Sequence, residues 1–83
     1  MLSITSTIVG NVKSRRKELG ISQFELAERS GVSYGSIKRF ETKGDISLSS
    51  LIKIAIVLEC EDDFKTLFSR KKYRSIEDVI NDR

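Results

Sequence analysis

The side chains best suited to bind another molecule lie in a short polar segment near the middle of this chain. Tyr34, Lys38 and Arg39 fall at spacings that place them on one side of a helix. The arginine guanidinium is a planar fork of N–H donors, which suits phosphates and the O6 and N7 acceptors of guanine. These residue types favour binding of an anionic, hydrogen-bonding partner over catalysis of a reaction.

The residues that usually carry enzyme or metal chemistry are scarce. The chain has no histidine and one cysteine, Cys60, so it lacks the commonest acid/base and metal-ligating side chain and a multi-cysteine zinc site. No glycine pattern predicts a phosphate-binding loop. We interpret Cys60 as a small hydrophobic residue at a helix end, with a reactive thiol as the alternative. We therefore expect no enzyme, catalytic residue, metal or cofactor.

The positive charge is concentrated in one half of the chain. Residues 1–47 hold eight Lys and Arg against five Asp and Glu, while residues 48–83 hold seven of each, and the net charge is +3. A nucleic-acid surface would need such an excess, although an ordinary solvated face can also have it. No apolar run approaches a membrane span, and residues 1–9 do not resemble a signal peptide. We expect a cytoplasmic protein.

Periodic apolar residues and capping signals predict an all-α protein without proline. We predict helices over residues 7–19, 23–30, 34–42 and 48–58, and a fifth whose start is surrounded by the acidic residues Glu59, Glu61, Asp62 and Asp63. In the first helix an exposed basic cluster is expected at Lys13, Arg15 and Lys17. The buried face of the fifth helix is predicted to consist of Phe64, Leu67 and Phe68. With 83 residues the core is small, which makes a homodimer a reasonable expectation.

The chain between residues 23 and 42 has the features of a helix-turn-helix motif. Two short helices are joined by only three residues, and Gly31 permits the left-handed backbone that reverses the chain. Val32 should fill the corner between the helices, and Ala27 lets them approach closely. Residues 1–68 are therefore predicted to form one compact domain, with residues 69–83 as a short helical tail for interaction or dimerisation.

At this point the chain resembles the phage Cro and repressor family of bacterial helix-turn-helix regulators, also called the xenobiotic response element family. The resemblance covers residues 8–68, and its specific parts are 12–16 (VKSRR), 19–20 (LG), 22–27 (SQFELA), 31–33 (GVS), 37–41 (IKRFE) and 51–58. It implies a five-helix bundle of the lambda-repressor type, in which the third helix enters the major groove and the second crosses the phosphate backbone.

The resemblance also implies which residues touch DNA. Arg39 is the expected base reader, Lys38 and Lys43 are expected to bind phosphates, and the full set is Gln23, Ser33, Tyr34, Gly35, Ser36, Lys38, Arg39, Lys43 and Ser47. A solvated helix face is the alternative for Arg39, and an exposed first-turn residue is the alternative for Gln23.

Two neighbouring positions of the third helix are less clear. Tyr34 could place its ring against a thymine methyl or its hydroxyl on a phosphate, or it could cover the helix start as a half-buried aromatic residue. Gly35 replaces the usual polar residue, which removes one base contact, weakens the helix and allows the backbone to approach DNA closely.

Arg16 and Glu41 occupy inward helical positions, where they resemble the internal arginine and glutamate ion pair of the family. We assign them to structure rather than to DNA binding.

Family resemblance implies a dimeric repressor that binds double-stranded operator DNA with two-fold symmetry. A second and less specific resemblance, carried by residues 46–48 and 73–80, is to the HipB-like regulators found beside HipA-type kinase toxins. It suggests an alternative: an antitoxin or protein-interaction module that grips a kinase-type toxin through the fifth helix and the tail. In either case a bacterial or phage origin is implied.

Overall fold

The computed structural model describes residues 3–71, and within them it has five α-helices and no strand. The helices are α1 (Ser3–Glu18), α2 (Gln23–Ser30), α3 (Tyr34–Lys43), α4 (Leu48–Val57) and α5 (Asp62–Lys65). The predicted all-α, five-helix class is thus confirmed. Residues 72–83 of the predicted tail, which spans residues 69–83, lie outside the described residues. No helix among residues 3–71 is long and apolar enough to cross a membrane.

Side-chain caps set the starts of the helices around the turn. Ser22 Oγ accepts a hydrogen bond from the Glu25 amide at 3.0 Å, and the Glu25 carboxylate accepts one from the Ser22 amide, which completes a capping box. Gly31 ends α2 with φ 77°, a left-handed conformation that glycine adopts without steric cost. The two short helices therefore begin and end where the motif requires.

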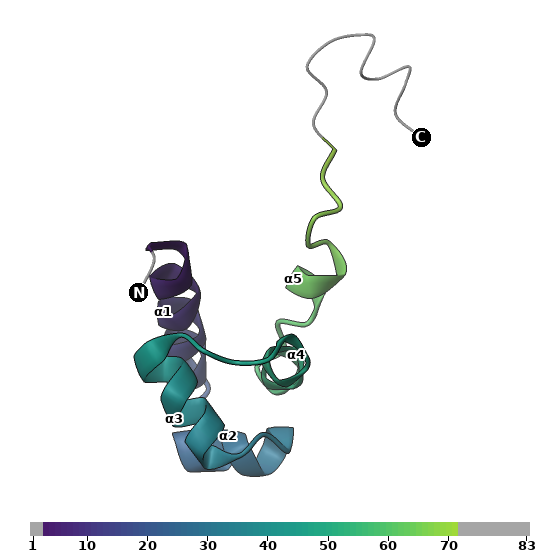
Figure 1. Ribbon diagram of the computed structural model, residues 1–83. Coiled ribbons are helices and arrows are strands. Elements are labelled where there is room, and N and C mark those ends of the chain that lie inside the picture. Colours follow the sequence, from purple (N-terminus) through teal and green to yellow (C-terminus); the bar gives the residue numbers. More distant parts are fainter. Residues whose placement is uncertain (1–2, 72–83) are drawn as a thin grey trace, which may run out of the picture.

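The core lies where α2 meets α3 and α4. Leu26, Ile37, Ile54 and Leu58 are fully buried there, and Val32 fills the corner of the turn with 5 % of its surface exposed. Figure 1 shows α1 running alongside α3, with α2 across their base and α4 seen end-on beside them. Burial of these aliphatic side chains is the main stabilising term for a domain of this size.

Some helix ends differ from those that the sequence predicts. α1 is already helical at Ser3, the first described residue, instead of starting at residue 7, because residues 3–6 contain no helix breaker and each added residue gains a backbone hydrogen bond. α3 continues for one residue to Lys43, and Gly44 ends it with φ 79°.

The predicted buried face of the fifth helix is wrong in part. α5 ends at Lys65, Phe68 has a left-handed φ of 63° and 94 % of it is exposed, and 51 % of Leu67 is exposed. Only Phe64 of the three predicted residues is even partly buried. The chain leaves the helical path before Leu67 and Phe68, so these side chains do not pack as a helical face.

Arg15 does not belong to a freely exposed basic cluster, contrary to the prediction. Its Nε donates to the carbonyl oxygen of Leu58 at 3.0 Å, and its guanidinium lies 3.9 Å from the Glu59 carboxylate. A guanidinium at this position satisfies a free carbonyl at the end of α4. Arg15 therefore ties α1 to α4.

Candidate nucleic-acid interface

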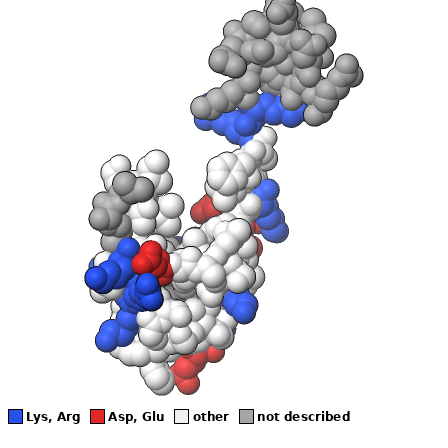
Figure 2. All heavy atoms as spheres, in the orientation of Figure 1, with Lys and Arg blue, Asp and Glu red and all other residues white. Residues whose placement is uncertain are grey.

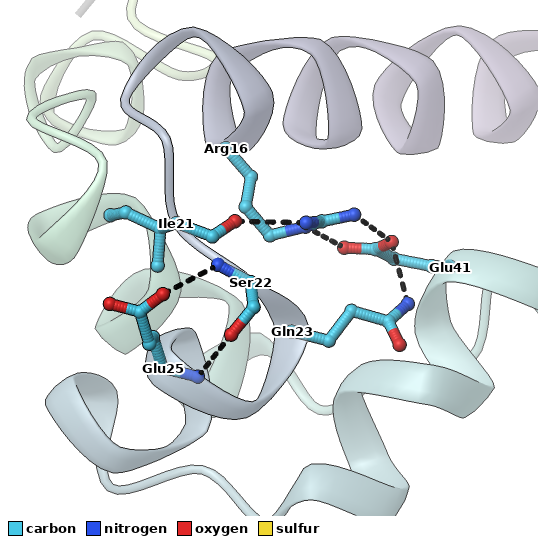
Figure 3. Close-up of polar contacts among 6 residues, drawn as sticks. All are labelled: Arg16, Ile21, Ser22, Gln23, Glu25 and Glu41. Carbon is cyan, nitrogen blue, oxygen red and sulfur yellow. Dashed lines mark hydrogen bonds and ion pairs between the residues drawn. The ribbon is translucent and has the colours of Figure 1, made fainter.

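A buried ion pair, Arg16 with Glu41, fixes the base of the candidate interface (Figure 3). Arg16 Nε donates to Glu41 Oε2 at 2.9 Å and Nη2 donates to Oε1 at 3.0 Å, and the side chains are 10 % and 2 % exposed. Arg16 Nη1 also donates to the Ile21 carbonyl oxygen at 2.9 Å. One guanidinium therefore joins α1, the turn before α2, and α3.

Gln23 extends this network from the first turn of α2. Its Nε2 donates to Glu41 Oε1 at 2.8 Å, and Figure 3 shows the side chain directed toward the Glu41 carboxylate. The residue is part-buried rather than freely exposed. An amide NH₂ group has two hydrogens, so one remains for a second acceptor such as a phosphate oxygen. The role of Gln23 at DNA remains a prediction, but its side chain is already oriented by Glu41.

The hydroxyls of Ser33 and Ser36 form a small network at the start of α3. Ser33 Oγ accepts from the Ser36 amide at 3.1 Å and donates to Ser36 Oγ at 2.8 Å. Because the Ser33 hydroxyl proton is used inside the protein, the Ser36 hydroxyl is the one left to donate outward.

Ser47 has the same capping role at the start of α4. Its Oγ accepts from the Ser50 amide at 3.2 Å and lies 3.4 Å from Ser49 Oγ. At the end of α3, Lys43 is exposed. Both residues therefore lie at the ends of the loop that joins α3 to α4.

The outward face of α3 contains the remaining candidates. Tyr34, Gly35, Lys38 and Arg39 are all exposed, whereas Ile37 on the opposite face is fully buried. Figure 2 shows Lys and Arg side chains gathered over the C-terminal end of α3, with an acidic side chain among them. The helix thus presents cations and hydrogen-bond donors outward and aliphatic side chains inward.

An exposed ion pair, Arg39 with Asp45, occupies this outward face. Arg39 Nη2 lies 3.5 Å from Asp45 Oδ2, and the side chains are 70 % and 66 % exposed. Exposed pairs of this kind contribute about 0–1 kcal/mol, so the guanidinium can exchange this partner for another at little cost. Arg39 is held loosely and in reach of solvent.

Two residues at this face were missed by the sequence-based assignment. Asp45 pairs with Arg39, and Phe24 contacts the Tyr34 ring with 59 % of its own surface exposed. A large apolar residue on the polar side of α2 was a visible signal for Phe24. Nothing in the sequence spacing indicated that Asp45 would pair with Arg39.

The described residues contain no group of three or more His, Cys, Asp or Glu side chains that could hold a metal ion. Residues 23–47 supply two packed helices, α2 and α3, with cationic and polar side chains on one exposed face.

Comparison with known proteins gives one family. A helix-turn-helix family model matches residues 12–65, which include all of α2, α3 and α4. No curated protein and no solved structure matches the chain. The match spans well over half of the 83 residues, and it coincides with the motif and the exposed face described above. The chain belongs to the Cro/repressor-type helix-turn-helix family of DNA-binding transcriptional regulators.

Proposed function

We propose that this protein is a sequence-specific, dimeric repressor that places α3 in the major groove of double-stranded DNA. The exposed cationic face of α3, on a helix whose other face is buried, is the observation that carries the proposal. A helix fits the major groove, where each base pair presents a distinct pattern of donors and acceptors. The buried ion pair holds α3 in place so that this face keeps one orientation.

Within this interface the residues divide into base readers and backbone anchors. Arg39 is the proposed base reader, because its fork of donors can reach two acceptors of a guanine at once. Lys38 and Lys43 supply charge for phosphates. The second hydrogen of the Gln23 amide and the Ser36 hydroxyl supply neutral hydrogen bonds to the DNA backbone. Ser33 and Ser47 act by capping the starts of α3 and α4.

A direct test measures binding of the purified protein to duplexes chosen from a random library, at several salt concentrations. We expect a steep fall in affinity with salt, and a loss in the Arg39→Ala and Lys38→Ala variants. Lys53→Ala removes an exposed cation from α4, outside the motif, and is the matched control. A flat salt dependence, or equal affinities for all four proteins, would show that α3 does not read DNA.

A groove between α1, α4 and α5 supports the dimer. Its volume is about 340 Å³, its lining is mainly apolar, and Ile8, Leu48 and Leu67 in its wall are each at least 43 % exposed. We propose that a second copy of this chain covers the groove, because a dimer on a two-fold operator needs a self-complementary apolar surface of this kind.

The dimer is tested by two substitutions in the same helix. Leu48→Lys places a charge in the groove wall and should produce monomers in analytical ultracentrifugation, with weaker binding to a two-fold duplex. Ile56→Lys changes a residue of α4 that is 54 % exposed and does not line the groove, and it should leave the dimer intact. Equal dimerisation of the two variants would place the dimer interface elsewhere.

The antitoxin alternative depends on the fifth helix and the tail. Residues 72–83 lie outside the described residues, and α5 has only four residues. No observation in residues 3–71 favours a kinase-type toxin over a second copy as the partner, so the DNA-binding repressor is the function that we propose.

A further inference from the structure

The N-terminal ends of α2 and α3 bring two aromatic side chains together at the surface. The ring centroids of Phe24 and Tyr34 are 6.0 Å apart with an interplanar angle of 66°, an edge-to-face contact. Phe24 is 59 % exposed and Tyr34 43 % exposed. Phosphate binding gives no role to a phenylalanine, so this apolar surface beside the cationic face calls for a separate explanation.

Lys38 fixes the position of the tyrosine ring from another side. It lies one helical turn after Tyr34, and its Nζ is 5.4 Å from the ring centroid. The ring therefore has two partners, the Phe24 ring and the Lys38 ammonium group, while 43 % of Tyr34 stays exposed. An apolar ring held in this way can present a defined surface to a base edge.

Gly35, the residue after Tyr34, adds no side chain to the exposed face of α3. Its backbone is helical, and a Cβ built there would meet no atom within 4 Å outside the neighbouring residues of the helix. Neither a left-handed φ nor crowding inside the domain therefore requires glycine at this position, although glycine weakens a helix relative to alanine. The open space lies on the outward face, between the residues assigned to DNA contact.

We propose that Gly35 and Tyr34 form the methyl notch, a small apolar site that takes the C5 methyl group of a thymine. The proposal rests on the proposed function and names one base feature that α3 reads. In the major groove the thymine methyl is the one apolar group, while the other base features are hydrogen-bond donors and acceptors. A glycine backbone beside an aromatic ring offers apolar contact and room for close approach. Phe24 contacts the Tyr34 ring and thereby limits its positions.

Replacement of thymine by uracil tests the methyl directly. Each dT of the library-selected duplex is changed in turn to dU, which removes the methyl and keeps the base pair and its O4 acceptor. Burial of one such group corresponds to roughly fourfold in affinity, so we expect one position per half-site to weaken wild-type binding about threefold to fivefold. Tyr34→Ala should show no preference for dT at that position. Equal binding of all the dU duplexes would overturn the proposal.

Two glycine variants separate the methyl notch from helix stability. Gly35→Ala and Gly10→Ala both add a Cβ to an exposed helical position with no atom within 4 Å, so both should raise the midpoint of unfolding. Only Gly35→Ala should lose the preference for dT over dU, because its new methyl group occupies the notch. If Gly35→Ala prefers dT over dU as strongly as Gly10→Ala does, the methyl notch does not exist. If the wild-type protein binds no selected duplex, the proposed function fails together with this inference.

Discussion

Two of the arginine–carboxylate pairs in this domain, Arg16 with Glu41 and Arg39 with Asp45, differ in almost every physical respect. The buried ion pair is bidentate, its side chains are 10 % and 2 % exposed, and a glutamine shares the carboxylate. The exposed ion pair is a single contact at 3.5 Å between side chains that are 70 % and 66 % exposed. Both lie within or beside α3, since Glu41 and Arg39 are two residues apart.

This difference shows how one short helix is anchored on one side and free to bind on the other. Charges taken out of water must keep their partners, because an unpaired buried charge is very costly. Charges that stay in water lose little when they exchange partners. Glu41 is therefore suited to hold α3 in position, and Arg39 is suited to exchange Asp45 for another anionic partner, as its proposed contact with DNA requires.

The largest expected effect comes from breaking the buried ion pair. Glu41→Ala should lower the free energy of unfolding by about 3–5 kcal/mol, because Arg16 is left as an uncompensated buried charge. Urea unfolding followed by circular dichroism measures the change.

The double variant Arg16→Met with Glu41→Leu serves as the control. It replaces both charges by apolar groups of similar size and should recover most of the lost stability. A Glu41→Ala loss below about 1 kcal/mol would mean that the pair is not buried in solution as it is in this structure.

Breaking the exposed ion pair should have little effect on stability and a larger effect on DNA binding. Arg39→Ala should change the free energy of unfolding by no more than about 0.5 kcal/mol, as is usual for a surface site. Its affinity for a selected duplex should fall by about 1–3 kcal/mol, with relaxed preference at one base pair. Fluorescence anisotropy against single-base variants of the duplex measures both effects. Unchanged base preference would make Arg39 a phosphate contact instead.

Much of the anchored side could be predicted from local sequence. Ser22, Ser33 and Ser47 are caps whose effect depends on the next three residues, and Gly31 marks a left-handed position, so local chemistry indicates both. The inward phases of Arg16 and Glu41 follow from helical spacing, and the structure brings the two together.

The binding side and the end of the chain were harder to predict. Asp45 meets Arg39 only through the geometry of the loop after α3, and a part-buried orientation of Gln23 depends on where Glu41 lies. Leu67 and Phe68 are apolar but lie beyond the end of α5, because burial needs a tertiary surface that helical spacing does not reveal.

Gln23 belongs to the network of the buried ion pair but is only part-buried, and its substitution should have an effect of intermediate size. Gln23→Ala removes a hydrogen bond to a carboxylate that keeps its other partners, so the free energy of unfolding should fall by about 1–1.5 kcal/mol. Gln23→Glu should cost more, because it sets a second carboxylate beside Glu41. Thermal unfolding measures which of the two variants loses more stability. The reverse order would show that the amide makes no hydrogen bond to Glu41.

The smallest expected effect belongs to Asp45, and its sign tells how the exposed ion pair works. If Asp45 only competes with DNA for Arg39, Asp45→Ala should tighten binding, by at most about fivefold given the weakness of such pairs. Part of that gain would come simply from removing a negative charge near phosphates. The same substitution in an Arg39→Ala background measures that part alone, and the difference between the two gains in affinity gives the contribution of the ion pair.

If Asp45→Ala instead weakens binding and relaxes base preference only while Arg39 is present, Asp45 orients the guanidinium for its base. The exposed ion pair would then be a support for recognition rather than a competitor.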